Sequence, residues 1–216
     1  MRLDAVARFL QDIATDDARD AGLADGWVVR RTTMTVHRLP RFRDDVDLVT
    51  RCSGMSLTAA ERCTDLTLDG EPAVDTVSLW AFVGGDGRPQ RIDPIAFEQY
   101  GIPVGSPRIS TRLRHPDPPA GVAGRPWVVR VADVDVLGHV NNAVAWAVVE
   151  EVLADAGIEV AAPFVAEVEF RTALAPDDTP ELVVVPGADG EVRAWVRCGD
   201  AVRTSAWFVP GAGPRS

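Results

Sequence analysis

The order of the hydrophobic patterns repeats once along the chain, and this repeat limits the folds open to it. Between Leu3 and Ala14, apolar residues recur at the spacing of an amphipathic helix, which we expect over 3–21 with Gly22 at its end. Alternating or β-branched runs follow at 27–37, 46–53, 60–68 and 73–83. The first half therefore predicts one long helix followed by a meander of antiparallel strands.

The second half shows the same order. A strand at 127–131 and a helix at 139–156 are predicted, and strands then follow at 164–172, 181–186, 191–198 and 201–209. Residues 73–80 resemble 201–207, and an acidic turn precedes a strand in both halves, which together indicate an internal duplication. The fold class is α+β, with each long helix packed on an antiparallel sheet. In the first half Met1 stands next to the helix, so we expect its leading strand to be absent or truncated.

A segment rich in Pro and Gly separates the two halves. Residues 115–126 contain four Pro and two Gly, a concentration that neither helix nor strand tolerates. We therefore divide the chain into a unit at 1–114, a linker at 115–126 and a unit at 127–216.

Composition excludes several classes of function. A net charge of −10 argues against a nucleic-acid partner, and no apolar run is long enough to span a bilayer, so we expect a cytoplasmic protein. Cys52, Cys63 and Cys198 lack the paired spacing of a disulfide framework or zinc site and are expected to be buried free thiols. His37 and His115 have no ligand spacing around them, so neither is given a role and no metal or cofactor is expected.

Polar residues gather in the run Asp133–Asn142, just before the second helical pattern. A helix that begins at or near Gly138 would place partial positive charge beside Asp135, keeping it ionised, and could polarise a substrate carbonyl. The alternative is structural: an acid caps the helix, His139 is half-buried, and the two Asn side chains bond to local backbone. The assembled string favours an active site.

This string resembles the signature of the acyl-ACP thioesterases, which are double-hotdog enzymes. The resemblance rests on Asp133–Asn142 with Ala145-Trp146 and Glu150-Glu151, on 10–15, Gly22, 27–30, 39–45 and 77–80 in the first half, and on 168–171 in the second. It implies a tandem hotdog fold and hydrolysis of fatty acyl thioesters, with catalysis in the C-terminal hotdog and acyl binding largely in the N-terminal one.

By position, Asp135 matches the catalytic Asp of the family and His139 matches the motif His. Asp135 would activate water or attack the thioester, and His139 would orient Asp135 or the water. Backbone and side-chain groups of Gly138, Asn141 and Asn142 would stabilise the oxyanion or orient the reacting groups. The resemblance implies an acyl carrier protein or coenzyme A thioester as substrate, which arginines at 30–31, 38–43 and 108–114 could attract, although a solvated arginine face is the favoured interpretation.

The chain departs from the plant members of the family at two positions. Leu137 stands where they have Asn, and Ala173 stands where they have a functional Glu. Glu169 is a possible substitute acid, although a solvated strand residue is the expected interpretation. A non-catalytic acyl-thioester-binding or regulatory hotdog protein, and a hotdog hydratase, remain alternatives. The duplicated halves allow a monomer with intrachain pairing or a homodimer.

Overall fold

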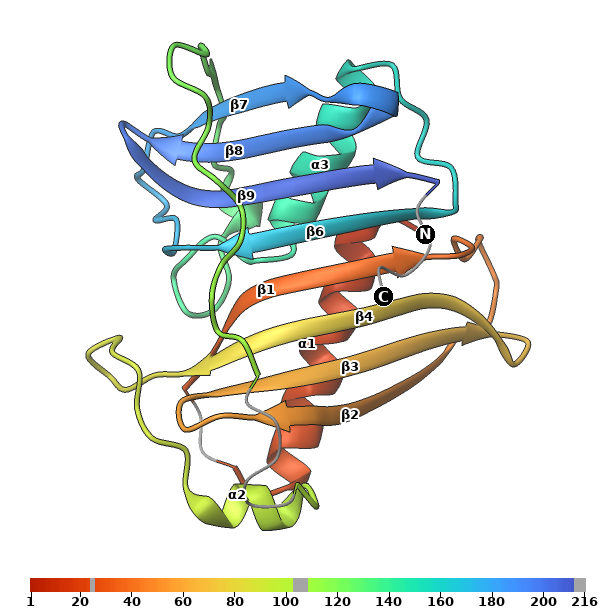
Figure 1. Ribbon diagram of the computed structural model, residues 1–216, viewed down its shortest axis with the longest axis vertical. Coiled ribbons are helices and arrows are strands. Elements are labelled where there is room, and N and C mark those ends of the chain that lie inside the picture. The colour runs from red at the N-terminus through yellow and green to blue at the C-terminus, as the bar shows by residue number, and fades with distance from the viewer. Residues whose placement is uncertain (24–25, 103–108, 212–216) are drawn as a thin grey trace.

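The computed structural model describes residues 1–23, 26–102 and 109–211, and its strands form one antiparallel sheet (Figure 1). The strand order is β2-β3-β4-β1-β6-β9-β8-β7-β5. The strands are β1 (Trp27–Val36), β2 (Asp47–Met55), β3 (Ala59–Leu68), β4 (Glu71–Phe82), β5 (Arg125–Pro126), β6 (Phe164–Phe170), β7 (Glu181–Pro186), β8 (Val192–Cys198) and β9 (Ala201–Pro210). The predicted α+β class is confirmed.

The two long helices, α1 (Leu3–Asp20) and α3 (Val144–Asp155), lie on the same face of this sheet (Figure 1). They also contact one another. Glu150 of α3 accepts hydrogen bonds from the backbone N–H of Leu3 at 2.7 Å and from Nε of Arg2 at 3.1 Å. A carboxylate at a helix N-terminus satisfies an unpaired N–H and complements the helix dipole, so α3 stabilises the beginning of α1.

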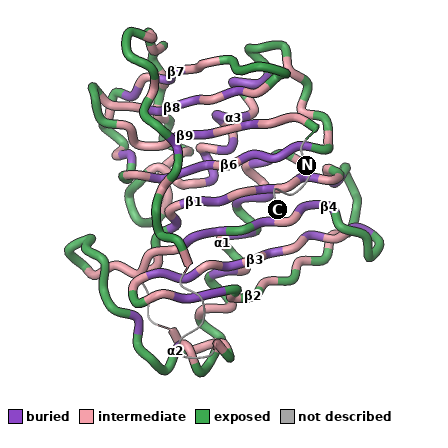
Figure 2. The backbone as a smooth tube through the Cα atoms, in the orientation of Figure 1, coloured by how far each residue is buried: buried purple, intermediate pink, exposed green. Residues whose placement is uncertain are grey.

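The two halves share one sheet because β1 pairs with β6. Thr32 lies opposite Val168 and Met34 lies opposite Ala166 in this antiparallel pair. Apolar residues from both helices and from the helix-side face of the sheet join into one core that crosses the seam, and buried segments accordingly lie on either side of it (Figure 2). The halves are thus joined by strand pairing and by a common core.

The structure corrects two expectations about local elements and adds one helix. Residues 127–131 do not form the predicted strand: β5 covers two residues, and a short 3-10 helix, η1, follows at Val131–Asp133. Val128 and Val131 are exposed there, so these apolar residues do not mark a buried strand. The long helix α3 begins at Val144 and not near Gly138, and a short helix α2 (Pro94–Gln99) was not predicted.

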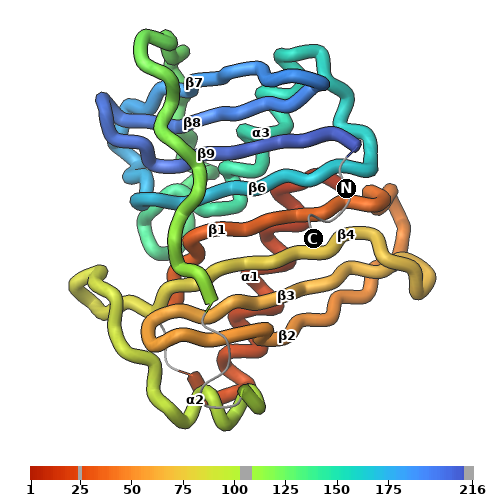
Figure 3. Tube along the Cα trace, in the orientation of Figure 1, coloured from red at the N-terminus to blue at the C-terminus, as the bar shows by residue number. Residues whose placement is uncertain are grey.

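The chain crosses from the first half to the second over the face of the sheet opposite the helices (Figure 3). The Pro- and Gly-rich linker therefore packs as a cover, and His115 at its beginning is only 5% exposed. Cys52, Cys63 and Cys198 are free but half-buried, so their expected full burial was wrong. In the described ranges, none of the helices is sufficiently long and apolar to cross a membrane.

Candidate active site

The acid-bearing segment before α3 is a small closed turn. Val134 and Val140 form an isolated antiparallel bridge, and the N–H of Asp135 donates to the carbonyl of His139 at 2.9 Å. The Gly138 N–H closes the turn by donating to the carbonyl of Asp135 at 3.0 Å, and its φ of 78° is one that glycine adopts without strain. Oδ1 of Asp135 accepts the Leu137 N–H at 2.9 Å. Asp135 and Gly138 are thus both needed for the shape of the turn.

The candidate residues occupy different environments within this turn. Asp135 is half-buried, whereas Leu137, Gly138 and His139 are exposed, Leu137 by 78%. The His139 side chain makes no hydrogen bond to Asp135 in the described part of the chain; the two residues are linked through their backbones. The Gly138 N–H is already used in the turn. The expected contact by which His139 would orient Asp135 is therefore not seen among the described residues, and the Gly138 N–H is not available to stabilise an oxyanion.

The two asparagines have different positions at the start of α3. Oδ1 of Asn141 accepts the Ala143 N–H at 2.8 Å, and the Asn141 carbonyl accepts the Val144 N–H at 2.9 Å. Asn141 therefore stabilises the beginning of the helix, as the structural alternative predicted. Asn142, in contrast, lines a pocket together with Trp146 of α3.

This pocket is small and lies between the two helices and the sheet, where the two halves meet. It is lined by Ala7, Leu10 and Gln11 of α1, Val29 and Thr32 of β1, Ser78 and Trp80 of β4, Phe170 of β6, and Asn142 and Trp146. Most of this lining is apolar, with a few polar groups among it, which is the usual composition of a small-molecule site. The pocket therefore joins an apolar wall, largely from the first half, to the last residue of the acidic motif.

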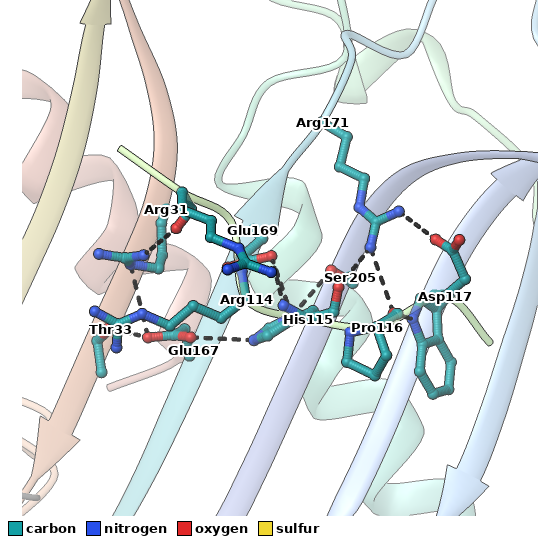
Figure 4. A network of polar contacts seen from close by, with 12 residues as sticks. Arg31, Thr33, Arg114, His115, Pro116, Asp117, Glu167, Glu169, Arg171 and Ser205 are labelled. Carbon is teal, nitrogen blue, oxygen red and sulfur yellow. Dashed lines mark hydrogen bonds and ion pairs between the residues drawn. The ribbon is translucent and has the colours of Figure 1, made fainter. Parts of the chain in front are cut away.

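Glu169 lies on the opposite face of the sheet from this pocket. Its neighbour Phe170 lines the pocket, and successive side chains of a strand point to opposite faces. The Glu169 side chain is fully buried under the linker, where its two oxygens accept the backbone N–H groups of Arg114 at 2.6 Å and His115 at 3.0 Å (Figure 4). The expectation of a solvated strand residue was wrong. Ala173 lies beyond the end of β6.

His115, which the sequence patterns gave no role, is the centre of this buried network (Figure 4). Its ring stacks on Trp207 with centroids 4.3 Å apart, Nδ1 lies 2.9 Å from Oγ of Ser205, and Nε2 lies 3.1 Å from Oε1 of Glu167. Burial raises the pKa of Glu167, but hydrogen bonds from His115 and Thr33 outweigh it, so that the pKa lies below its usual value. The network fastens the linker to β6 and β9.

The same cluster includes the residues closest to a metal-ligand arrangement. Donor atoms of His115, Glu167 and Glu169 lie within 4.8 Å of one another. Both Glu169 oxygens accept linker N–H groups, however, and the two ring nitrogens of His115 face Ser205 and Glu167 on opposite sides. A single ion could not replace these contacts without releasing the linker, so the geometry fits a hydrogen-bonded clamp.

The arginine groups that could attract a carrier are not a uniform surface. Arg31 is only 5% exposed and its Nε lies 3.9 Å from Glu167, so it belongs to the buried network. Burial lowers the pKa of Arg30, which donates to the carbonyl of Arg171 at 3.0 Å. Arg108 lies outside the described residues. Neither member of the 30–31 pair is thus a solvated surface group.

Comparisons with known proteins agree with this architecture. A putative oleoyl thioesterase from Lactobacillus plantarum has the same fold, with a TM-score of 0.75 and 20% identity over 98% of this chain and 90% of that one. An acyl-ACP thioesterase from Bacteroides thetaiotaomicron matches with a TM-score of 0.79 and 15% identity, and the 12:0-ACP thioesterase from Umbellularia californica with a TM-score of 0.76 and 19% identity. Both of these matches cover 97% of this chain and 89% of the other. These likenesses confirm the tandem hotdog fold.

Sequence comparison identifies the family. An uncharacterised protein of Mycobacterium tuberculosis is 27% identical over 210 residues, which cover 95% of this chain and 83% of that protein. Residues 1–100 match the acyl-ACP thioesterase N-terminal domain, and residues 122–199 match the acyl-ACP thioesterase C-terminal domain. The two matches cover most of the sequence in the expected order, and the chain therefore belongs to the acyl-ACP thioesterase family, the enzymes that hydrolyse fatty acyl thioesters.

Proposed function

We propose that this enzyme hydrolyses acyl thioesters of acyl carrier protein in the cytoplasm, with Asp135 as its central acid. The observation that carries this proposal is the continuity between the turn and the pocket. Asp135 lies seven residues before Asn142, the turn between them is closed by backbone hydrogen bonds, and Asn142 lines the apolar pocket. A thioester whose acyl chain fills the pocket then has its carbonyl near the beginning of α3.

Hydrolysis requires one proton transfer in each direction. Asp135 accepts a proton from water as the water oxygen attacks the thioester carbonyl carbon, and the carbonyl electron pair moves onto oxygen. When that pair returns, the carbon–sulfur bond breaks and the thiolate leaves with the proton, which gives a free acid and a thiol. Because the Gly138 N–H is engaged in the turn, the side-chain amide of Asn142 is the better candidate to donate to the oxyanion.

The two halves divide this work. Residues 1–114 provide most of the acyl pocket, residues 127–216 provide the acid, and the linker 115–126 joins them. Pairing of β1 with β6 within one chain completes the site without a second copy, which supports a monomer. Coenzyme A thioesters have the same reacting bond and form the second substrate class to compare.

Steady-state thiol release from a panel of acyl-ACP and acyl-CoA substrates tests the activity, and Asp135→Asn tests the mechanism. Loss of a general base should lower kcat by about 100-fold or more. Asp133→Asn is the matched control, because Asp133 caps η1 through the Arg130 N–H at 2.8 Å and should cost far less activity. His139→Ala should also cost less than Asp135→Asn, since its side chain is exposed.

The outcomes separate catalysis from binding. Full activity of folded Asp135→Asn would refute the role of Asp135. Saturable binding of the panel by the unmodified protein, without release of thiol, would instead identify a non-catalytic acyl-thioester-binding protein. Product that retains the thioester and gains water across a double bond would identify a hydratase.

A further inference from the structure

Two buried hydroxyl groups lie side by side in the wall of the pocket. Oγ1 of Thr32 and Oγ of Ser78 are 3.0 Å apart, and both residues are only 5% exposed. A hydrogen bond between two hydroxyls uses one of their two protons. Within the described residues no other partner takes the second proton, so the pair has a donor to spare as well as acceptor capacity.

A residue that lines the same pocket carries a second buried donor. Trp80 contributes to the lining, and its indole N–H is buried without a hydrogen-bond partner among the described residues. The indole N–H groups of Trp27 and Trp207 are also unpaired in the part of the chain that the structure describes, but of the three only Trp80 lines the pocket, where a bound molecule could supply its partner. An indole N–H can only donate, so its partner must be an acceptor.

A plain hydrocarbon chain would leave these groups unsatisfied. Each polar group buried without a partner weakens binding by about fivefold to a hundredfold, whereas an oxygen atom on the acyl chain accepts from a hydroxyl and an indole N–H. We propose that the acyl group taken by this enzyme has an oxygen substituent, an oxo or hydroxyl group, close to its thioester carbonyl. This assignment rests on the proposed function, because it assumes that the pocket holds the acyl chain.

The position of the oxygen follows from the other end of the pocket. Asn142, the residue proposed to contact the thioester carbonyl, lines the same small cavity as Thr32, Ser78 and Trp80. Because these groups line one small cavity, the oxygen that meets them belongs to one of the first carbons after the carbonyl. A 3-oxo or 3-hydroxy acyl group has this arrangement.

The test compares octanoyl-, 3-hydroxyoctanoyl- and 3-oxooctanoyl-CoA, which differ only in the substituent. At least one oxygenated substrate should exceed the saturated one in kcat/KM by about three- to tenfold, the size of one buried neutral hydrogen bond. Thr32→Val should reduce or invert that ratio. Thr64→Val is the matched control, because Thr64 forms a similar hydroxyl pair with Thr50 at 2.9 Å outside the pocket, and its ratio should not change.

Binding of the same three thioesters to Asp135→Asn, measured by calorimetry, keeps the two proposals distinguishable. Tighter binding of an oxygenated acyl group, with no hydrolysis by the unmodified enzyme, would reject the proposed function while supporting the assigned acyl class. Equal or better use and binding of the saturated thioester would overturn the assignment and leave the hydrolase intact. A ratio that Thr32→Val does not alter would also overturn it.

Discussion

Substitution of Glu169 tests whether this residue stabilises the fold, by holding the linker, or takes part in catalysis. Its fully buried carboxylate accepts two consecutive backbone N–H groups, at 2.6 and 3.0 Å, and lies across the sheet from the pocket. Glu169→Gln keeps the size of the side chain but replaces one acceptor oxygen by an NH₂ group. One linker N–H then faces a donor, and the other loses its charged partner. We expect a large loss of stability and little loss of activity.

The magnitude follows from these two contacts. A buried N–H left without an acceptor costs about 1–3 kcal/mol, and the weakening of the second charge-assisted hydrogen bond adds about 1 kcal/mol. The free energy of unfolding should therefore fall by about 2–4 kcal/mol. With a urea dependence of about 2 kcal/mol/M, the midpoint of unfolding should move down by about 1–2 M. Activity per folded molecule should change by less than about threefold, because the substitution leaves the pocket lining untouched.

Glu181→Gln provides the matched control. Glu181 forms an ion pair with Arg197 at 3.0 Å, but its side chain is 44% exposed, so the substitution should cost less than about 1 kcal/mol. Equal unfolding midpoints for the two variants would refute the clamp. Loss of turnover in a stable Glu169→Gln protein would refute its structural assignment and return it to the role of substitute acid.

Two further predictions concern pH. Hydrogen bonds hold the pKa of Glu167 below its usual value even though burial raises it. The stability that Glu167 contributes is therefore present above its unfolded pKa and is lost as the pH falls through its folded pKa. Thr33→Val removes one of these hydrogen bonds and should move this loss to higher pH when unfolding is measured across the acid range, whereas a loss of stability that does not depend on pH would contradict the prediction. Burial and a hydrogen bond to Asp17 raise the pKa of Tyr100 from 10.0 to about 12. The stability that Tyr100 contributes is therefore complete below pH 10 and is lost as the pH rises through about 12. Because Tyr100 is the single tyrosine, ultraviolet titration should detect one transition near that value, and Asp17→Asn should lower it.

Elements whose side chains alternate between core and surface could be predicted from the sequence. The helix expected at 3–21 is observed at Leu3–Asp20, and the strand expected at 181–186 is observed at those residues. The strand expected at 127–131 failed because apolar residues there are exposed, so the pattern did not record burial. Hydrophobic periodicity predicts an element only where packing against the core produces it.

The local structure of the candidate site could be predicted only in part. The helix begins five residues after His139 because Gly138 is in a left-handed turn that a helix cannot include. The clamp had no local signal, since His115 and Glu169 are 54 residues apart, and glutamate is rarely buried completely. Whether Asp135 and His139 are catalytic remains a prediction.

The crossing of the linker over the sheet also affects how the protein can be divided. A boundary chosen from composition would cut near the Pro- and Gly-rich segment, which looks like a simple tether. Separating the halves there would expose the paired edges of β1 and β6, and a cut after His115 would put Glu169 and its two N–H partners on different pieces of chain. Split or circularly permuted forms should therefore open at the Asp69–Gly70 turn, where an added side chain would meet nothing within 4 Å of Gly70.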